Sequence, residues 1–389
     1  MLEHTSDTSI AGSCSLALRG RNAPLDGLRG IAATMVAFYH TILYYDTSLI
    51  DRVLERPIQS LCDTRDIVTK IGLSVFNGAA AVILFFVLSG VVLHMSLQRD
   101  AAKSGAAIVA DFAIKRVCRI LPTVIVCMSI FYGLTIFYQG AGGVPQVSFE
   151  SYLANAFLYK ITMHGASLTL QTELLAIPFL LMFFFVIRRF GAFGVFLCVI
   201  YSLHVLQHPQ LAFGAVNLAE NLFAFAIGVA LATPQAQRLF ANAGWSAIVA
   251  SAVTFLVLRQ LVRWIEIPGL IAHVLAAGAL IGAVLHGIPN RVTFFLSSRP
   301  VHFLGRISFS FYLFHVPVMW VFVALASSFV EVPSPNALEW GLAVGFVSVI
   351  ATIPVAAVSE MYVERGSIEL GKWLCKNLPF RGVSPRYSA

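Results

Sequence analysis

Ionisable side chains lie inside several long apolar stretches of this sequence, and the first such stretch carries two. LDGLRGIAATMVAFYH, residues 25–40, has Arg29 near its start and His40 eleven residues later. Eleven residues of α-helix place the two side chains within about 20° of one face and about 16 Å apart along the axis. If this helix spans a membrane, His40 should face the bundle interior or a water-filled cavity. Its imidazole is then a candidate general base, unless it only bonds a neighbouring helix.

Two further segments carry charges that fit the same kind of site. Arg116 and Arg119, in KRVCR, are three residues apart and share one helix face. Guanidinium groups suit a phosphate clamp, although basic residues also simply flank the cytoplasmic end of a span. Glu173, in LTLQTE, is a lone acid beside an apolar stretch. We expect it to lie at a depth similar to that of His40, so that the two could form an acid–imidazole pair.

Four other polar residues are candidates for lining a pocket. Ser89, in FFVLSGVVL, is not expected to be a nucleophile, because the glycine that a nucleophile elbow needs two residues earlier is absent. The segment FLGRISFSFYLFHVPV, residues 303–318, adds Ser310, Tyr312 and His315. We interpret His315 as a structural or cavity-lining residue rather than the main base. The remaining histidines fall near predicted span ends or in loops, and we expect them at interfaces.

The composition points to a polytopic membrane protein. Of the 389 residues, 58% are hydrophobic and 12% are charged, whereas a soluble domain carries about 25% charged residues. Residues 1–24 are polar and contain no secretory signal. The six cysteines are scattered without a CxxC pair, so we expect neither a disulfide framework nor a metal site. We attribute the net charge of +7 largely to lysines and arginines that lie on the cytoplasmic side of the predicted spans, and not to nucleic-acid binding.

The apolar segments predict an all-α transmembrane bundle of about ten spans. These lie at residues 28–45, 72–97, 115–138, 168–187, 191–204, 211–232, 244–262, 267–286, 308–330 and 339–358. With both termini in the cytoplasm, 19 of the 26 lysines and arginines fall on the inner side and the remaining 7 outside. We therefore predict a polar cytoplasmic N-terminus (1–24), a membrane domain (25–370) and a basic cytoplasmic tail (371–389).

The five quoted segments occur in the order seen in the acyltransferase-3 family, which the chain resembles from about residue 24 to 370. These membrane O-acyltransferases modify bacterial lipopolysaccharides, exopolysaccharides, Nod factors and some antibiotics. The family's arginine–ten residues–histidine motif falls on Arg29 and His40, and its paired arginines on Arg116 and Arg119. Its tryptophan–hydroxyl–leucine–x–x–glutamate pattern is matched by Thr169, Leu170 and Glu173, but Leu168 replaces the tryptophan. Gly366 likewise replaces the proline of a Glu-Arg-Pro ending.

The resemblance implies acyl-CoA, most simply acetyl-CoA, as a donor substrate, with no bound cofactor. Arg29, Arg116 and Arg119 would then bind the donor at the cytoplasmic mouth, while His40, supported by Glu173, acts on a carbohydrate hydroxyl. The expected surroundings are the lipids of a bacterial inner membrane. Whether His40 is a base or carries the acyl group stays open. The rival interpretations are a proton-coupled secondary transporter and a non-enzymatic partner of polysaccharide export.

Overall fold

The computed structural model describes residues 22–138, 147–261, 267–331 and 335–377, and these ranges contain helices and no strand. The all-α prediction is thus confirmed. The helices are α2 (Ala23–Tyr45), α3 (Thr64–Val75), α4 (Gly78–Arg99), α5 (Gly105–Phe137), α6 (Phe149–Ala156), α7 (Ser167–Leu175), α8 (Ile177–Gln207), α9 (Val216–Leu231), α10 (Pro234–Phe240), α11 (Trp245–Leu261), α12 (Ile267–His286), α13 (Arg291–Leu296), α14 (Arg299–Ala326), α15 (Ala337–Ser359) and α16 (Arg365–Asn377).

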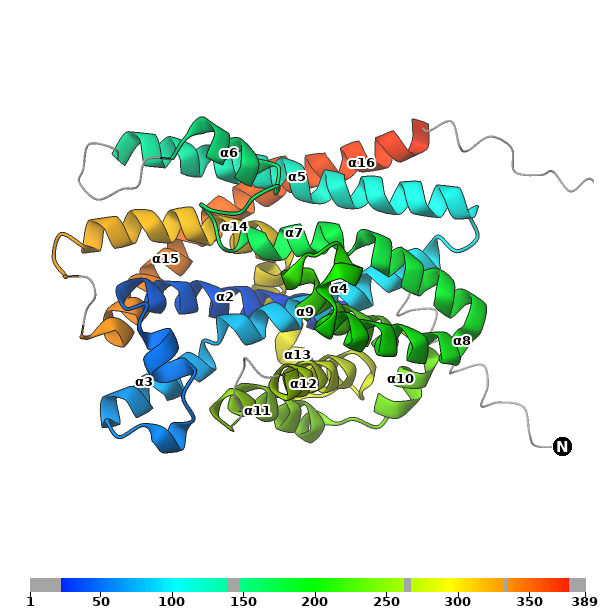
Figure 1. Ribbon diagram of the computed structural model, residues 1–389, viewed down its shortest axis with the longest axis horizontal. Helices are drawn as coiled ribbons and strands as arrows, with labels where there is room; N and C mark the ends of the chain where they lie inside the picture. Colours follow the sequence, from blue (N-terminus) through cyan, green and yellow to red (C-terminus); the bar gives the residue numbers. More distant parts are fainter. Residues whose placement is uncertain (1–21, 139–146, 262–266, 332–334, 378–389) are drawn as a thin grey trace, which may run out of the picture.

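Local sequence signals fix where the helices of the site begin. The side chains of Asn22, Asn77 and Ser104 accept hydrogen bonds from backbone N–H groups in the first turns of α2, α4 and α5. Such N-caps satisfy donors that would otherwise lack a partner at the start of a helix. Helices α5 and α14 run in roughly the same direction, and α5, α6 and α16 form an outer layer (Figure 1).

Six helical stretches in the described residues are long and apolar enough to cross a membrane. They are Thr64–Arg99, Gly105–Phe137, Ile177–Gln207, Ile267–His286, Arg299–Ala326 and Ala337–Asn377. A seventh is the pair α9 and α10, which is bent by 80° at its break. Helix α2 is not among these, although it has 23 residues, since Arg29, His40 and its tyrosines make it more polar. The count of ten spans and the cytoplasmic termini stay predictions.

Helix α8 is folded back on itself, so the two closely linked spans predicted at 168–187 and 191–204 fall on α7 with the first arm of α8 and on its second arm. Gly191 adopts φ 55° and ψ −130°, a conformation that side chains other than glycine rarely reach. Beyond it, a Cβ on Gly194 would lie 2.7 Å from the carbonyl oxygen of Val186. The ring of Phe179 likewise stacks on that of Tyr201, with centroids 6.4 Å apart. The two arms of α8 therefore form an antiparallel hairpin.

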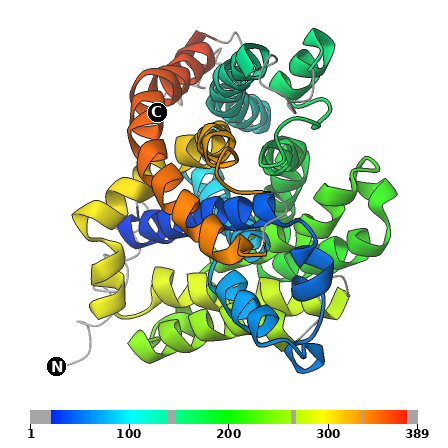
Figure 2. The same ribbon diagram turned by 90° about the vertical axis from the view of Figure 1, so that its left-hand side faces the viewer.

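Helix α2 lies in the middle of the bundle and packs directly on α14 and α15 (Figure 2). Gly30 of α2 faces Gly305 of α14 so closely that a Cβ on Gly30 would come within 2.6 Å of the Gly305 nitrogen. Ten residues further along each helix lie His40 and His315, and their rings are in hydrogen-bond contact. The two helices are thus parallel and in register, and their paired glycines permit the close approach.

A second glycine crossing joins α4 to α9. A Cβ on Gly228 would lie 2.9 Å from the Cα of Gly90 and would overlap the carbonyl oxygen of Val87. Gly90 therefore lets α4 and α9 approach closely, as small residues do where helices of membrane proteins meet. Ser89, its neighbour, turns toward a different helix and belongs to the candidate site.

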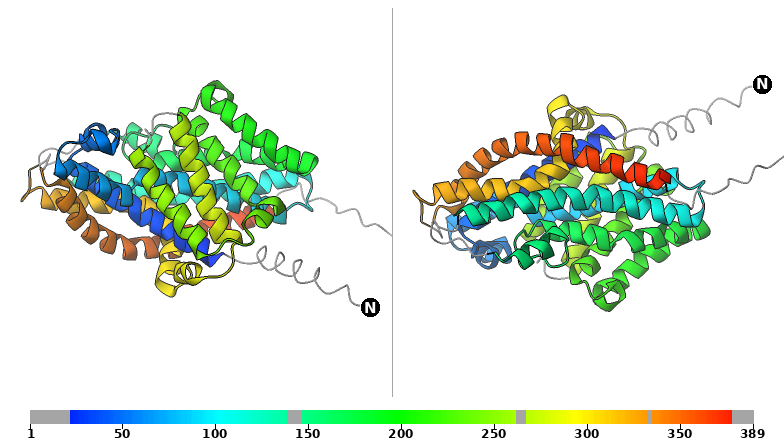
Figure 3. Two further views of the ribbon diagram at one scale, coloured as in Figure 1. Left: turned by 90° about the horizontal axis from the view of Figure 1, so that it is seen from below. Right: turned by 90° about the horizontal axis from the view of Figure 1, so that it is seen from above.

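The C-terminal helix α16 packs along α5 (Figure 3). A Cβ on Gly371 would lie 3.1 Å from the Cβ of Cys118, and the Cys375 thiol lies 3.8 Å from the Asp111 carbonyl oxygen. Helix α16 continues across the predicted boundary at residue 370. The outer parts of both predicted terminal segments, residues 1–21 and 378–389, fall outside the described residues.

The loop between α4 and α5 holds a small ion-pair network. Lys103 lies 2.8 Å from a carboxylate oxygen of Asp100 and 2.6 Å from one of Asp111, and Lys115 lies 3.2 Å from Asp100. Burial alone would raise the pKa of the Asp100 carboxyl, but the hydrogen bonds from Lys103 and Lys115 outweigh it. The pKa of Asp100 therefore lies below its ordinary value.

Candidate active site

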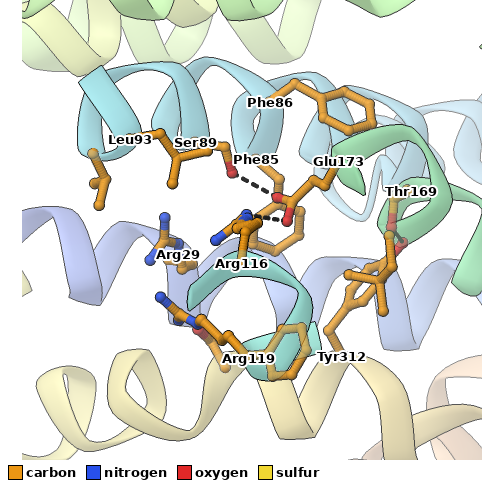
Figure 4. Close-up of a pocket in the computed structure, with 14 residues that line it drawn as sticks. Arg29, Phe85, Phe86, Ser89, Leu93, Arg116, Arg119, Thr169, Glu173 and Tyr312 are labelled. Atoms are coloured by element: carbon orange, nitrogen blue, oxygen red, sulfur yellow. Dashed lines mark hydrogen bonds and ion pairs between the residues drawn. The ribbon is translucent and has the colours of Figure 1, made fainter. Parts of the chain in front are cut away.

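Three arginines predicted to bind a donor surround one narrow cavity, which we call the arginine cavity. It encloses about 60 Å³. Arg29 comes from α2, and Arg116 and Arg119 come from α5 (Figure 4). The other lining residues are Phe85, Phe86, Ser89, Val92, Leu93, Thr169, Leu170, Glu173, Ser308, Phe309 and Tyr312. Three cationic side chains and a single carboxylate give this lining a net charge of +2, which favours an anionic ligand.

Glu173 connects α7 to two other helices inside this cavity. Its carboxylate accepts a hydrogen bond of 2.6 Å from the Ser89 hydroxyl and forms an ion pair with Arg116 (Figure 4). Arg116 is buried, and its Nε has no hydrogen-bond partner among the described residues. Within the same ranges, Arg29 makes no hydrogen bond or ion pair. The cavity therefore keeps guanidinium donors that a bound anion can use.

Arg119 is held from outside the arginine cavity by Glu364, the glutamate of the Glu-Arg-Gly segment that follows the last predicted span. The two side chains are 3.5 Å apart, and the Ser310 hydroxyl donates to the other Glu364 oxygen at 3.3 Å. Glu364 is 3% exposed and sits at the end of a short π-helical turn, Glu360–Glu364. Ser310 thus lies behind the cavity rather than on its wall. The sequence feature that could have pointed to Glu364 is the Glu364–Arg365 pair, which follows the last predicted span.

The predicted pairing of Glu173 with His40 is not what the structure shows. His40 Nδ1 lies 2.9 Å from His315 Nε2, whereas Glu173 bonds Ser89 and Arg116. The reason is helix placement, since the parallel register of α2 and α14 brings the two histidines together. A guanidinium also compensates a half-buried carboxylate more fully than a neutral imidazole can. His315, interpreted as structural or cavity-lining, holds a structural position as the hydrogen-bond partner of His40.

The hydrogen bonds of the two histidines define their tautomers. His315 Nδ1 lies 2.7 Å from the Tyr312 carbonyl oxygen, which can only accept, so Nδ1 carries the proton. With both rings neutral, His315 Nε2 then has a lone pair and accepts from His40 Nδ1. The remaining nitrogen of His40, Nε2, is left unprotonated. This is the form of imidazole that a general base requires.

His40 opens on a second cavity, the histidine cavity, of about 450 Å³. Its other lining residues are Ala79, Val82, Ile83, Gly165, Ala166, Leu168, Thr169, Glu220, Asn221, Ile267, Leu270 and Tyr312. Thr169 and Tyr312 line both cavities, and their hydroxyl groups are 3.1 Å apart (Figure 4). The Thr169–Tyr312 hydrogen bond therefore lies on the wall that the arginine cavity and the histidine cavity share.

Three of the histidines expected at interfaces are buried inside the protein. His94, His164 and His273 are each at most 1% exposed. His164 donates from Nε2 to the Leu313 carbonyl at 3.0 Å, and its Nδ1 accepts from the Ser167 backbone and hydroxyl. It thereby ties the start of α7 to α14. No spacing in the sequence separates such a structural histidine from a catalytic one.

A family described as an acyltransferase domain matches residues 22–359 of this chain. The chain belongs to this family. The match covers both cavities and ends before Glu364 and α16. No curated protein and no solved structure matches the chain. The family and the apolar helices together show that this acyltransferase is a multi-pass membrane protein.

Proposed function

We propose that this membrane acyltransferase moves an acyl group, most simply acetyl, from cytoplasmic acyl-CoA to a hydroxyl of an exported or cell-surface carbohydrate. Its place would be the inner membrane of a bacterium. One observation carries the proposal: a cavity of three arginines and a cavity containing a hydrogen-bonded histidine share one thin wall. The first suits the anionic donor and the second suits a neutral hydroxyl acceptor.

Only the mouth of the arginine cavity has room for the phosphate groups of acyl-CoA. A volume of about 60 Å³ is well below the roughly 300–1,000 Å³ of ordinary ligand pockets. The nucleotide therefore stays outside, where Arg29 and Arg119 can bind its phosphates, and the thin acyl-bearing arm enters. Arg116 is engaged by Glu173, so we assign that pair to shaping the passage.

The reaction at His40 follows from its tautomer. Nε2 takes the proton of the acceptor hydroxyl as the oxygen attacks the thioester carbonyl carbon. The tetrahedral intermediate then collapses, the carbon–sulfur bond breaks, and the CoA sulfur leaves with the proton that His40 holds. An ester and free CoA result, and His40 returns to its starting form. His315 is a positioning residue, since it holds the Nδ1 proton of His40 and stabilises the imidazolium.

The proposal is tested with purified protein in liposomes supplied with radiolabelled acetyl-CoA, by measuring CoA release. His40→Ala should abolish turnover while acetyl-CoA still binds, because the arginines remain. His40→Gln should not restore it, since an amide cannot accept a proton at neutral pH. The matched control is His204→Ala, which alters an exposed histidine outside both cavities.

Arg29→Ala tests the donor site separately, and it leaves no described acid without its partner. Loss of one charge-assisted bond should cost about 1.5–3 kcal/mol, or roughly a 10- to 150-fold rise in KM for acetyl-CoA. Near wild-type turnover by His40→Ala, at matched amounts in the membrane, would remove the base from the mechanism. A protein that accumulates a solute and releases no CoA would instead be a transporter.

A further inference from the structure

We propose that the histidine cavity is the acceptor site and that Glu220 and Asn221 of α9 bind hydroxyl groups of a pyranose ring there. This inference rests on the proposed function and identifies a part of the site that the motifs do not reach. The two residues are adjacent in α9 and line the same cavity as His40. The cavity thus contains the base and a separate polar contact.

Glu220 and Asn221 both have unused acceptor oxygens. Within the described ranges, the Glu220 carboxylate makes no hydrogen bond or ion pair. Asn221 donates through Nδ2 to the Asn217 carbonyl at 2.8 Å, which leaves its Oδ1 as an acceptor. A carboxylate and an amide oxygen on consecutive residues accept from neighbouring hydroxyl groups, and the bonds to the carboxylate are charge-assisted.

The remaining walls of the cavity suit the less polar faces of a sugar. Val82, Ile83 and Leu270 contribute apolar side chains, while Thr169 and Tyr312 contribute hydroxyl groups. The volume of about 450 Å³ falls within the roughly 300–1,000 Å³ of small-molecule sites. A ring held by its hydroxyl groups at Glu220 can therefore present another hydroxyl to His40.

Gly165 offers a way to block this cavity without disturbing the packing. It lines the cavity, and a Cβ built on it meets no atom within 4 Å. Gly165→Phe should therefore fill space that the acceptor needs. Gly133→Phe is its matched control, because Gly133 of α5 also has open space around it and lies outside both cavities.

The experiment uses liposomes containing the full-length protein, radiolabelled acetyl-CoA, and octyl β-D-glucopyranoside as the acceptor probe at concentrations that leave the liposomes intact. Transfer to the glucoside and release of CoA are measured separately. Glu220→Ala should raise KM for the glucoside about 10- to 100-fold and leave KM for acetyl-CoA within about twofold. Glu220→Gln should show a smaller rise, since it keeps an acceptor but loses the charge.

Gly165→Phe should raise KM for the glucoside in the same way. Glu150→Ala, which removes an exposed carboxylate of α6, and Gly133→Phe should behave as wild type. Unchanged KM for the glucoside in both Glu220→Ala and Gly165→Phe would overturn the inference. So would a wild-type protein that hydrolyses acetyl-CoA and never acetylates the glucoside. A wild-type protein that releases no CoA at all would contradict the proposed function itself.

Discussion

Replacement of His315 by alanine should slow acyl transfer without weakening donor binding. In the resting enzyme His315 Nε2 accepts a neutral hydrogen bond of 2.9 Å from His40. In the transition state His40 carries a positive charge, so the same bond becomes charge-assisted. A neutral bond contributes about 1 kcal/mol and a bond to a charged group about 1.5–3 kcal/mol, so the gain in the transition state is about 1–2 kcal/mol, which corresponds to roughly a 5- to 30-fold loss of kcat. The proton of His40 is also free to move to Nε2, the wrong nitrogen for a base.

The loss should stay below the about 10⁴-fold effect seen when the aspartate of a serine-protease triad becomes asparagine. The assay is acetyl transfer at matched membrane amounts, with KM for acetyl-CoA and thermal unfolding measured in parallel. His315→Gln should recover part of kcat, because its amide oxygen can accept from His40 Nδ1. A kcat within about threefold of wild type in His315→Ala would refute the role given to the histidine pair. A raised KM for acetyl-CoA at unchanged kcat would refute it as well.

Tyr312→Phe removes the hydrogen bond to Thr169 on the wall between the cavities, and this wall should restrict the access of water to the thioester. Loss of about 1 kcal/mol there should raise the ratio of acetyl-CoA hydrolysis to transfer roughly fivefold. An unchanged ratio would show that the wall does not restrict water. Gly305→Ala introduces a Cβ that overlaps the backbone of α2, so thermal unfolding in detergent should report a destabilisation of about 1–3 kcal/mol. Asp100→Asn should lower the stability above about pH 5, where the Asp100 carboxylate bonds Lys103. Because the pKa of that carboxyl is lowered in the folded protein, the difference from wild type should vanish as the pH falls through it.

The sequence predicted the helical segments well, because apolar runs of span length leave little choice of secondary structure. Each of the ten predicted spans overlaps a helix, and even the short span at 191–204 corresponds to the second arm of α8. Arg29, Arg116 and Arg119 were also predicted as one group, and they line one cavity. These predictions needed only periodicity, charge and motif order.

The partners of the buried groups could not be predicted, since they depend on how helices distant in the chain are placed. Glu173 was expected on His40, but α7 lies against α5 and α4, which bring Arg116 and Ser89 to it. Glu364 belongs to the turn after α15, and only the fold shows that it reaches Arg119. The position of a residue along its helix predicts how deep its side chain lies in the membrane. It does not predict which side chain of another helix lies beside it.

The contact between Gly30 and Gly305 has a consequence for how this sequence can change length. One residue inserted between Gly30 and His40 would rotate the imidazole by about 100° around α2 and advance it by about 1.5 Å. His315 would then have no counterpart, and the base would lose its cavity. An equal insertion in α14 would not restore the pair, because it turns His315 in the same sense about a parallel axis and carries the two rings to opposite sides of the helix contact. The segment from Gly30 to His40 and the segment from Gly305 to His315 must therefore each keep their present length, although they are 275 residues apart in the chain (305 − 30).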